Sequence, residues 1–322
     1  MSAVGPRAAP ASLRGFDSDG FRAAVLRWYD AQGRAFPFRG TADPYLVLVS
    51  ETILQQTQIS RGAPAWEAFT ARFPTVEALA AATPADVIRA WAGLGYNRRA
   101  LNLHRAARIV TGELGGRLPR DVAGLERLPG VGPYTARAVA SIAFGVPVGA
   151  VDTNVRRVLG RSVAGHVDAL TARDLQAVAD ALAPLDRPAD WTHALMDVGS
   201  TRCRPRAPHC EECPARRCCR YAAAVGAAAA SVASPHPRPG AVRERPAAFS
   251  TTSRWLRGRI LERLRAVDGD GWVTFEGSLG EHSPAIVADT LRTLAAEGLV
   301  ELGPDLADGA AGVLLAARLP LA

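Results

Sequence analysis

The chain has 322 residues, 48% of them hydrophobic, which allows two or three domains with packed cores and excludes a wholly disordered chain. No apolar run reaches the roughly 18–20 residues that a membrane-spanning helix needs, so we expect no membrane partner. The formal net charge is +7, and all 38 residues counted as Lys or Arg are arginines. Any mechanism that needs a lysine amine is therefore excluded.

Positive charge is concentrated in the first three quarters of the chain. Residues 250–322 contain 7 arginines and 10 acidic residues, a net of −3, whereas residues 1–249 contain 31 and 21, a net of +10. This distribution favours a polyanionic partner that binds residues 1–249. The N-terminus lacks the apolar core of a signal peptide, so we expect the protein in the cytoplasm.

The predicted elements, in chain order, divide the sequence into four parts. Residues 1–15 are rich in Ala, Pro and Gly and are predicted to be disordered. In residues 16–221 apolar side chains recur at spacings of three and four, which predicts an all-α domain. Residues 222–249 have the composition of a linker. Residues 250–322 read as two helices and a short hairpin of strands, which predicts a small α/β winged-helix-like module.

A glutamate, Glu51, lies in an apolar helical stretch where Leu48 and Leu54 are expected to face the core. A carboxyl group in such surroundings has a raised pKa, which suits a general acid. On its own, a helix cap or a solvated side chain is the simpler explanation for a single glutamate.

The segment 128–136, Leu-Pro-Gly-Val-Gly-Pro-Tyr-Thr-Ala, separates two predicted helices. Gly130 and Gly132 permit a tight turn, and the backbone N–H groups at the start of the next helix can hold a phosphate. The segment therefore predicts a helix-hairpin-helix motif, although an ordinary turn that ends one helix and begins the next also fits.

Asp152 follows this segment after one short predicted helix. It lies at the start of the helical segment 151–159, Val-Asp-Thr-Asn-Val-Arg-Arg-Val-Leu. Asp at such a position is most often an N-cap, which accepts hydrogen bonds from the first backbone N–H groups. That reading also favours an ionised carboxylate.

All five cysteines lie within residues 203–219. Clustered cysteines in a chain without an export signal indicate a metal site rather than disulfides. Four of them form the pattern C-x6-C-x2-C-x5-C, which favours a [4Fe–4S] cluster over structural zinc, since zinc sites usually have two close pairs with a longer spacer. The predicted ligands are Cys203, Cys210, Cys213 and Cys219, and Cys218 is left over.

In this order and spacing, the four motifs resemble the helix-hairpin-helix DNA glycosylase superfamily with an iron–sulfur loop, over about residues 17–221. The segments SETILQQTQ, WAGLGYNRRALNLH, LPGVGPYTA and VDTNVRRVL are most similar to the A/G-specific adenine glycosylases of the MutY type. The resemblance implies a fold of two helical subdomains with a cleft. It also implies a double-stranded DNA partner containing a mispaired adenine, bound by a monomeric, nucleoid-associated protein.

The resemblance further implies a role for individual residues. Glu51 would protonate adenine at N7 and Asp152 would stabilise positive charge at C1′, with Tyr134 and Asn154 in support. Bifunctional relatives carry a lysine where Tyr134 stands, so no strand-cleaving lyase activity is expected. The residues expected to contact DNA are Gln55, Gln56, Thr57, the wedge residues Leu94 and Tyr96, Gly130, Gly132 and Arg39.

Two other functions stay open at this stage. One is a thymine or uracil mismatch glycosylase of the same superfamily, and the other is a non-catalytic iron–sulfur protein that binds DNA structures. The chain departs from the adenine glycosylase pattern at Phe38, where tryptophan is usual, and in residues 250–322, which are too short for a Nudix-like domain. The base opposite the adenine, 8-oxoguanine or guanine, is therefore also left open.

Overall fold

The computed structural model describes residues 10–229, 248–267, 269–303, 306–309 and 312–321, which are mainly helical. The chain forms two compact units. Unit one comprises residues 1–51 and 118–237, and unit two comprises residues 52–117 and 238–322. The chain passes from one unit to the other within a single helix, α2 (Pro44–Leu54), directly after Glu51. No helix in the described ranges is long and apolar enough to cross a membrane.

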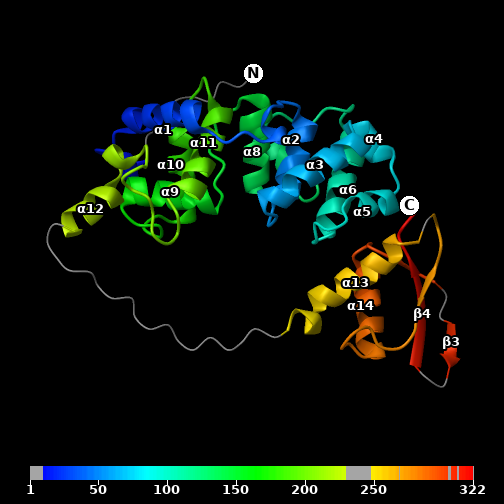
Figure 1. The fold of residues 1–322 in the computed structure, drawn as a ribbon. Coiled ribbons are helices and arrows are strands. Elements are labelled where there is room, and N and C mark those ends of the chain that lie inside the picture. Colours follow the sequence, from blue (N-terminus) through cyan, green and yellow to red (C-terminus); the bar gives the residue numbers. More distant parts are fainter. Residues whose placement is uncertain (1–9, 230–247, 268, 304–305, 310–311, 322) are drawn as a thin grey trace. The chain divides into compact units, whose positions relative to one another are not determined.

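Unit one is a bundle of helices around an apolar core (Figure 1). Phe21 and Val25 of the first helix pack in this core with Leu159, Leu175 and other aliphatic side chains of three later helices. Besides the first part of α2, its α-helices are α1 (Ser18–Gln32), α7 (Val122–Glu126), α8 (Pro133–Phe144), α9 (Thr153–Ala164), α10 (Ala172–Leu182), α11 (Pro188–Thr201) and α12 (Arg220–Ala229).

Local sequence signals determine where α7, α8 and α9 begin. Asp121 caps α7 by accepting a hydrogen bond from Gly124 N at 2.8 Å. Asp152 caps α9 in the same way, with Val155 N at 2.6 Å from its Oδ1. Pro133 stands at the first position of α8, where its missing N–H costs no hydrogen bond. The helix-hairpin-helix that the sequence predicts is therefore present as α7, a turn and α8.

Unit two combines the helices of residues 52–117 with those of the C-terminal module. The helices before the module are α3 (Ile59–Arg72), α4 (Val76–Ala81), α5 (Pro84–Ala90) and α6 (Arg98–Glu113). Thr75 and Thr83 cap α4 and α5 through their hydroxyl groups. Phe69, Phe73 and Trp91 meet edge to face inside this part of the unit.

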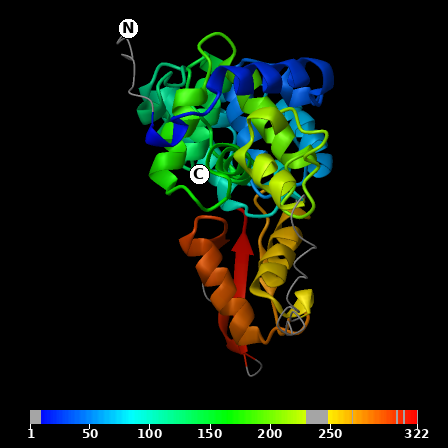
Figure 2. The ribbon, with the colours of Figure 1, turned by 90° about the vertical axis from the view of Figure 1, so that its left-hand side faces the viewer.

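The C-terminal module has two helices beside a small antiparallel sheet (Figure 2). The sheet has the strand order β1 (Val273–Phe275), β4 (Gly312–Arg318), β2 (Glu301–Leu302), and β3 (Leu306–Gly309) also pairs with β4. Thr274 of β1 lies opposite Ala316 of β4. The sequence predicts the two helices and the terminal hairpin but misses the short first strand between the helices. The elements are α13 (Ser253–Arg265), β1 (Val273–Phe275), α14 (Pro284–Ala296), β2 (Glu301–Leu302), β3 (Leu306–Gly309) and β4 (Gly312–Arg318).

The module shares its hydrophobic core with α5 and α6. Ile88 and Leu101 belong to the same buried cluster as Leu256 and Leu291 of the module. A backbone hydrogen bond of 2.8 Å joins Ala85 N of α5 to Pro320 O near the C-terminus. The module is thus an integral part of unit two.

Two predicted boundaries differ from the structure. The predicted linker of residues 222–249 begins later, because α12 continues to Ala229; an alanine-rich segment also has a high helix propensity. Of the predicted disordered residues 1–15, Ala11–Leu13 form a short 3₁₀ helix, and Arg220 donates a hydrogen bond to Ser12 O at 3.3 Å. Residues 1–9 and 230–247 lie outside the described residues.

Candidate active site

Two acidic residues and a tyrosine come together in unit one. Glu51 lies on α2, Tyr134 lies in the first turn of α8, and Asp152 caps α9. The Tyr134 hydroxyl donates a hydrogen bond to the Glu51 carboxyl group, and the charge of Asp152 acts on both. Three of the four predicted catalytic side chains therefore interact directly, although they are far apart in the sequence.

The surroundings of Glu51 leave a large fraction of its carboxyl group protonated near neutral pH. Burial raises the pKa of Glu51 to about 7, with only 8% of the residue exposed. The hydrogen bond from Tyr134 and the positive charge of Arg39 oppose this shift, while the negative charge of Asp152 adds to it. A carboxylic acid with this pKa can give up a proton at neutral pH.

Tyr134 is a hydrogen-bond donor that does not ionise here. Burial, followed by the negative charges of Glu51 and Asp152, raises the pKa of its hydroxyl well above the ordinary value. A tyrosine held in this way donates to one carboxyl group and supplies no amine.

Asp152 is held by the start of its own helix and by the fourth predicted catalytic residue, Asn154. The Asn154 Nδ2 donates to Asp152 Oδ2 at 2.8 Å, while the Asn154 Oδ1 accepts from Arg157 at 2.8 Å. Arg157, only 9% exposed, also donates to the carbonyl oxygens of Gly199 and Cys203 at 2.6 and 2.5 Å. One buried arginine thus connects the carboxylate to the cysteine loop, a link that the sequence does not reveal.

Arg39, which the sequence predicts to contact DNA, is paired with a buried carboxylate in the structure. Its guanidinium group donates to both carboxylate oxygens of Asp197, at 2.7 and 2.9 Å, and its side chain is only 9% exposed. Asp197 is fully buried on α11 and also accepts hydrogen bonds from Arg34, so removing Arg39 would leave a buried charge poorly paired. No motif marks Asp197 as a partner, since 158 positions separate it from Arg39.

In unit two, Arg99 makes hydrogen bonds to two of the segments that are predicted to contact DNA. Arg99 donates to the carbonyl oxygen of Gln55 at 2.5 Å, beyond the end of α2, and to those of Leu94 and Gly95 at 3.1 and 3.2 Å. Gln56 is exposed and adopts a φ of 58°, whereas Thr57 is buried. Of the predicted Gln55–Thr57 segment, Gln56 is thus the residue most fully presented to solvent.

The two predicted wedge residues differ in how far their side chains are exposed to solvent. Tyr96 is 49% exposed and has a φ of 45°, a backbone conformation that favours glycine. Leu94 is only 6% exposed and packs in the core, so Tyr96 is the exposed member of the predicted pair. The strained backbone at Tyr96 is supported because Trp91 Nε1 and Arg99 both donate to Gly95 O.

The hairpin glycines differ in their role. Gly130 has a φ of 78° and makes the turn, which side chains with a Cβ rarely allow. Gly132 has an ordinary φ of −89° and is the N-cap residue of α8, with no atom within 4 Å of where a Cβ would lie. Both glycines are exposed, so the backbone at the start of α8 is open to a ligand.

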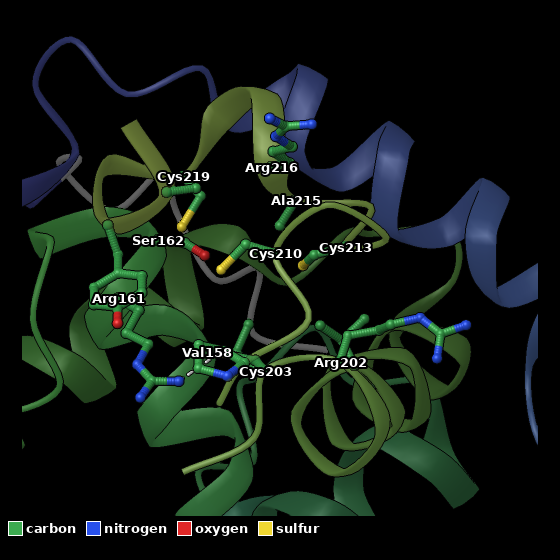
Figure 3. A pocket seen from close by; sticks show the side chains of 14 residues that line it. Val158, Arg161, Ser162, Arg202, Cys203, Cys210, Cys213, Ala215, Arg216 and Cys219 are labelled. Atoms are coloured by element: carbon green, nitrogen blue, oxygen red, sulfur yellow. Dashed lines mark hydrogen bonds between the residues drawn. The ribbon is translucent and has the colours of Figure 1, made fainter. Parts of the chain in front are cut away.

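The four predicted metal ligands line one cavity. Figure 3 shows Cys210, Cys213 and Cys219 around this space, with Cys203 beside it. Cys218 does not line the cavity; its thiol points to Asp17 Oδ2 at 3.8 Å. The structure thus separates the two adjacent cysteines in the way the spacing predicts.

The donor set fits a metal centre with four thiolate ligands. Burial, with a further contribution from the other three thiols, raises the pKa of the Cys213 thiol to about 12. Four thiolates this close repel one another, and bound metal cations would offset that repulsion. Arg161, only 8% exposed, supports the same negative charge by donating to Cys203 Sγ at 3.4 Å.

Comparison with known proteins identifies the family. Residues 49–171 match the HhH-GPD superfamily of base excision DNA repair proteins. An adenine DNA glycosylase of Mycolicibacterium smegmatis is 43% identical over 243 residues, covering 75% of this chain and 79% of the relative. The chain belongs to the adenine DNA glycosylases. A second member of the family, from Mycobacterium tuberculosis, is 37% identical over 287 residues, covering 85% of this chain and 90% of its own.

A solved structure supports the fold of the family's common part. A thermostable thymine-DNA glycosylase superposes with a TM-score of 0.61 at 31% identity, covering 64% of this chain and 97% of its own. The superposition leaves 36% of this chain without a counterpart, so it does not account for the whole molecule. Within the superfamily, the base that is removed has to be argued from the site.

Proposed function

We propose that the protein removes adenine mispaired with 8-oxoguanine or guanine from double-stranded DNA, by hydrolysis of the N-glycosidic bond. The observation that carries this proposal is the pairing of a buried carboxyl group of pKa about 7, Glu51, with Asp152. A target base stacked inside a duplex is out of reach, so the nucleotide has to be flipped out first. The proposal includes a monomeric enzyme acting on the chromosome in the cytoplasm.

The geometry supports a division of labour between the two carboxyl groups. Glu51 donates its proton to adenine N7, the C1′–N9 bond breaks, and the bonding electrons leave with the base. The positive charge that develops at C1′ is stabilised by Asp152, whose carboxylate is held by Val155 N and Asn154. Water then adds to C1′ and leaves an abasic site.

The residue facing Glu51 supports a monofunctional enzyme. A lyase of this superfamily attacks C1′ with a lysine amine and forms a Schiff base. Tyr134 occupies that position here, its hydroxyl donates to Glu51, and the chain contains no lysine. We therefore expect the abasic product to leave the strand intact until it is treated with alkali.

Glu51 also favours adenine over a pyrimidine. Protonation at N7 turns a purine into a good leaving group, whereas a thymine or uracil has no N7 to receive that proton. The similarity to a thymine-DNA glycosylase keeps pyrimidine excision as the second candidate. A non-catalytic DNA-binding protein is the third, and it gives no reason for a protonated carboxyl group beside a second acid.

One set of duplexes separates the three candidates. The substrates carry A:8-oxoG, A:G, T:G and U:G, and excision is followed in single-turnover assays with the intact protein, Glu51→Gln and Asp152→Asn. We expect adenine excision alone, and a loss of about 10²–10⁴-fold in the Glu51→Gln variant, typical of a missing general acid, with DNA binding retained. Adenine excision that survives Glu51→Gln contradicts the mechanism, and excision from T:G or U:G favours the second candidate.

A [4Fe–4S] cluster held by Cys203, Cys210, Cys213 and Cys219 belongs to the same proposal. Among the residues that the structure describes, no group of three or more His, Cys, Asp or Glu side chains is arranged to hold a single metal ion. A four-iron cluster takes one thiolate at each iron, so its ligands lie farther apart than those of one zinc ion. The four cysteines line one cavity, so each could provide one of these thiolates. The cluster would tie the loop to unit one and takes no part in the steps above.

The adjacent cysteines provide a matched test of the cluster. Cys219→Ala should abolish the visible thiolate-to-iron absorption of the purified protein, because a ligand is lost. Cys218→Ala should keep it, because that thiol points to Asp17 instead. Zinc in place of iron by elemental analysis would contradict the cluster, and equal loss in both variants would contradict the ligand set.

A further inference from the structure

Helix α13 of the C-terminal module is strongly basic although the module as a whole is acidic. The helix contains five arginines and a single acidic residue, Glu262. The module's net charge of −3 therefore combines a helix of +4 with a remainder of −7. Charge summed over the whole module hides this helix, which is why the overall distribution favours residues 1–249 as the polyanion-binding part.

A groove of about 690 Å³ separates α13 from the loop of residues 92–97, both in unit two. This volume falls in the usual range of ligand sites, about 300–1,000 Å³. Gly93 and Gly95 leave much of the loop side of the groove as bare backbone, and no atom lies within 4 Å of where a Cβ of Gly93 would be. The charged and aromatic side chains on the helix side are Arg254, Trp255, Arg259, Arg265 and one acidic residue, Glu262.

The groove is held open by a contact at its end. Arg265, on the last turn of α13, donates to Asn97 Oδ1 at 2.6 Å and to Ile88 O at 2.9 Å. The helix and the loop are thus fixed to each other by a half-buried guanidinium group, and the groove needs no rearrangement to form.

Among the residues that the structure describes, no acidic side chain pairs with Arg254. Its guanidinium group lies 4.9 Å from the centre of the Tyr96 ring, and in the described part of the chain it makes no ion pair or hydrogen bond. Arg259, by contrast, pairs with Glu262 at 2.5 Å. The exposed cation at the mouth of the groove therefore lies directly beside the exposed tyrosine.

We propose that this groove binds one sugar–phosphate strand of the DNA duplex, next to the base pair that Tyr96 opens, with Arg254 contacting a phosphate. The DNA substrate rests on the proposed function, and the role of Tyr96 is that of the wedge residue that the sequence predicts. The occupant follows from charge complementarity and from continuity, because the same loop lines the groove and presents Tyr96. Arginine suits this role, since its planar fork can donate to two phosphate oxygens at once.

The test measures how the affinity for DNA depends on salt. Each phosphate contact contributes a slope of about −0.9 to the plot of log affinity against log salt concentration. Arg254→Gln should weaken the binding of a fully paired duplex and reduce the slope by about 1, whereas Arg254→Lys should keep the slope. The control is Arg263→Gln, which removes the same charge from an exposed position on the same helix outside the groove.

Two outcomes overturn the proposal: an unchanged slope in Arg254→Gln, or an equal reduction of the slope in Arg263→Gln. Neutral methylphosphonate linkages add a second readout. One neutralised phosphate should weaken binding by the wild-type protein and have no further effect in Arg254→Gln. Because a fully paired duplex is not a substrate, these results can be read even if adenine excision fails.

Discussion

The pKa of Glu51, raised by burial to about 7, makes excision depend on pH near neutrality. Only the protonated acid can donate to adenine, so the single-turnover rate should be maximal below pH 7 and fall tenfold per unit above it. Tyr134→Phe removes a hydrogen bond that lowers this pKa, so the fall should move to higher pH. Excision rates measured across pH with both proteins check this. A rate that stays constant through pH 7 would show that Glu51 is not the proton donor.

The same residue has an effect on stability. The folded pKa of Glu51 lies above its ordinary value of 4.5, so its stabilising contribution is complete below pH 4.5 and is lost as the pH rises through 7. The loss amounts to about 3 kcal/mol, because one pKa unit corresponds to about 1.4 kcal/mol. The Glu51→Gln variant avoids this loss, because its side chain does not ionise. Its amide oxygen can still accept the hydrogen bond from Tyr134.

We therefore expect Glu51→Gln to gain stability relative to the wild type as the pH rises from 4.5 to above 7. Denaturant unfolding of both proteins at several pH values measures the difference. The burial of Glu51 would be contradicted by a difference that is the same at every pH.

At the scale of secondary-structure elements, α9 connects the active site to the cysteine loop. Arg157 can only donate hydrogen bonds, so it fixes the Asn154 amide with its oxygen toward the guanidinium group and its Nδ2 toward Asp152. Arg157→Gln should slow excision by about 10²-fold through misplacement of Asp152. It should also weaken the cysteine loop, because the carbonyl oxygens of Gly199 and Cys203 lose their donor.

Single-turnover excision and the visible absorption of the cluster measure these two effects together. Arg156→Gln is the control, since this neighbour on α9 is exposed and pairs with Asp168 at 3.2 Å. If Arg157→Gln retains full excision, α9 does not transmit support from the cysteine loop to Asp152.

The features that could be predicted from the sequence are those whose signals are local. The cap at Asp152, the turn at Gly130 and the spacing of the cysteines each depend on a few neighbouring residues, and the structure contains each of them. The pairs Arg39–Asp197 and Arg157–Cys203 join positions 158 and 46 residues apart, and only the folded chain reveals them. For the same reason Leu94 was indistinguishable from Tyr96 in sequence, although one is buried and the other exposed.

At the scale of the whole molecule, the C-terminal residues complete the unit that begins at residue 52. Leu256 is fully buried in a cluster with Ile88 of α5 and Leu101 of α6, and Arg265 adds hydrogen bonds to the same region. Helices α5 and α6 thus depend on side chains that come about 160 positions later in the chain. We infer that they gain and lose stability together with the module.

Leu256→Ala tests this coupling. Truncating a buried leucine typically costs about 2–5 kcal/mol, because apolar contacts are lost and a cavity is left. If unit two unfolds as one cooperative body, amide hydrogen exchange should accelerate in α5 and α6 as much as in α13 and α14. Exchange in α1 and α9 of unit one, which do not share this cluster, serves as the internal control. Faster exchange confined to residues 250–321 would show that the module folds independently of the helices on which it packs.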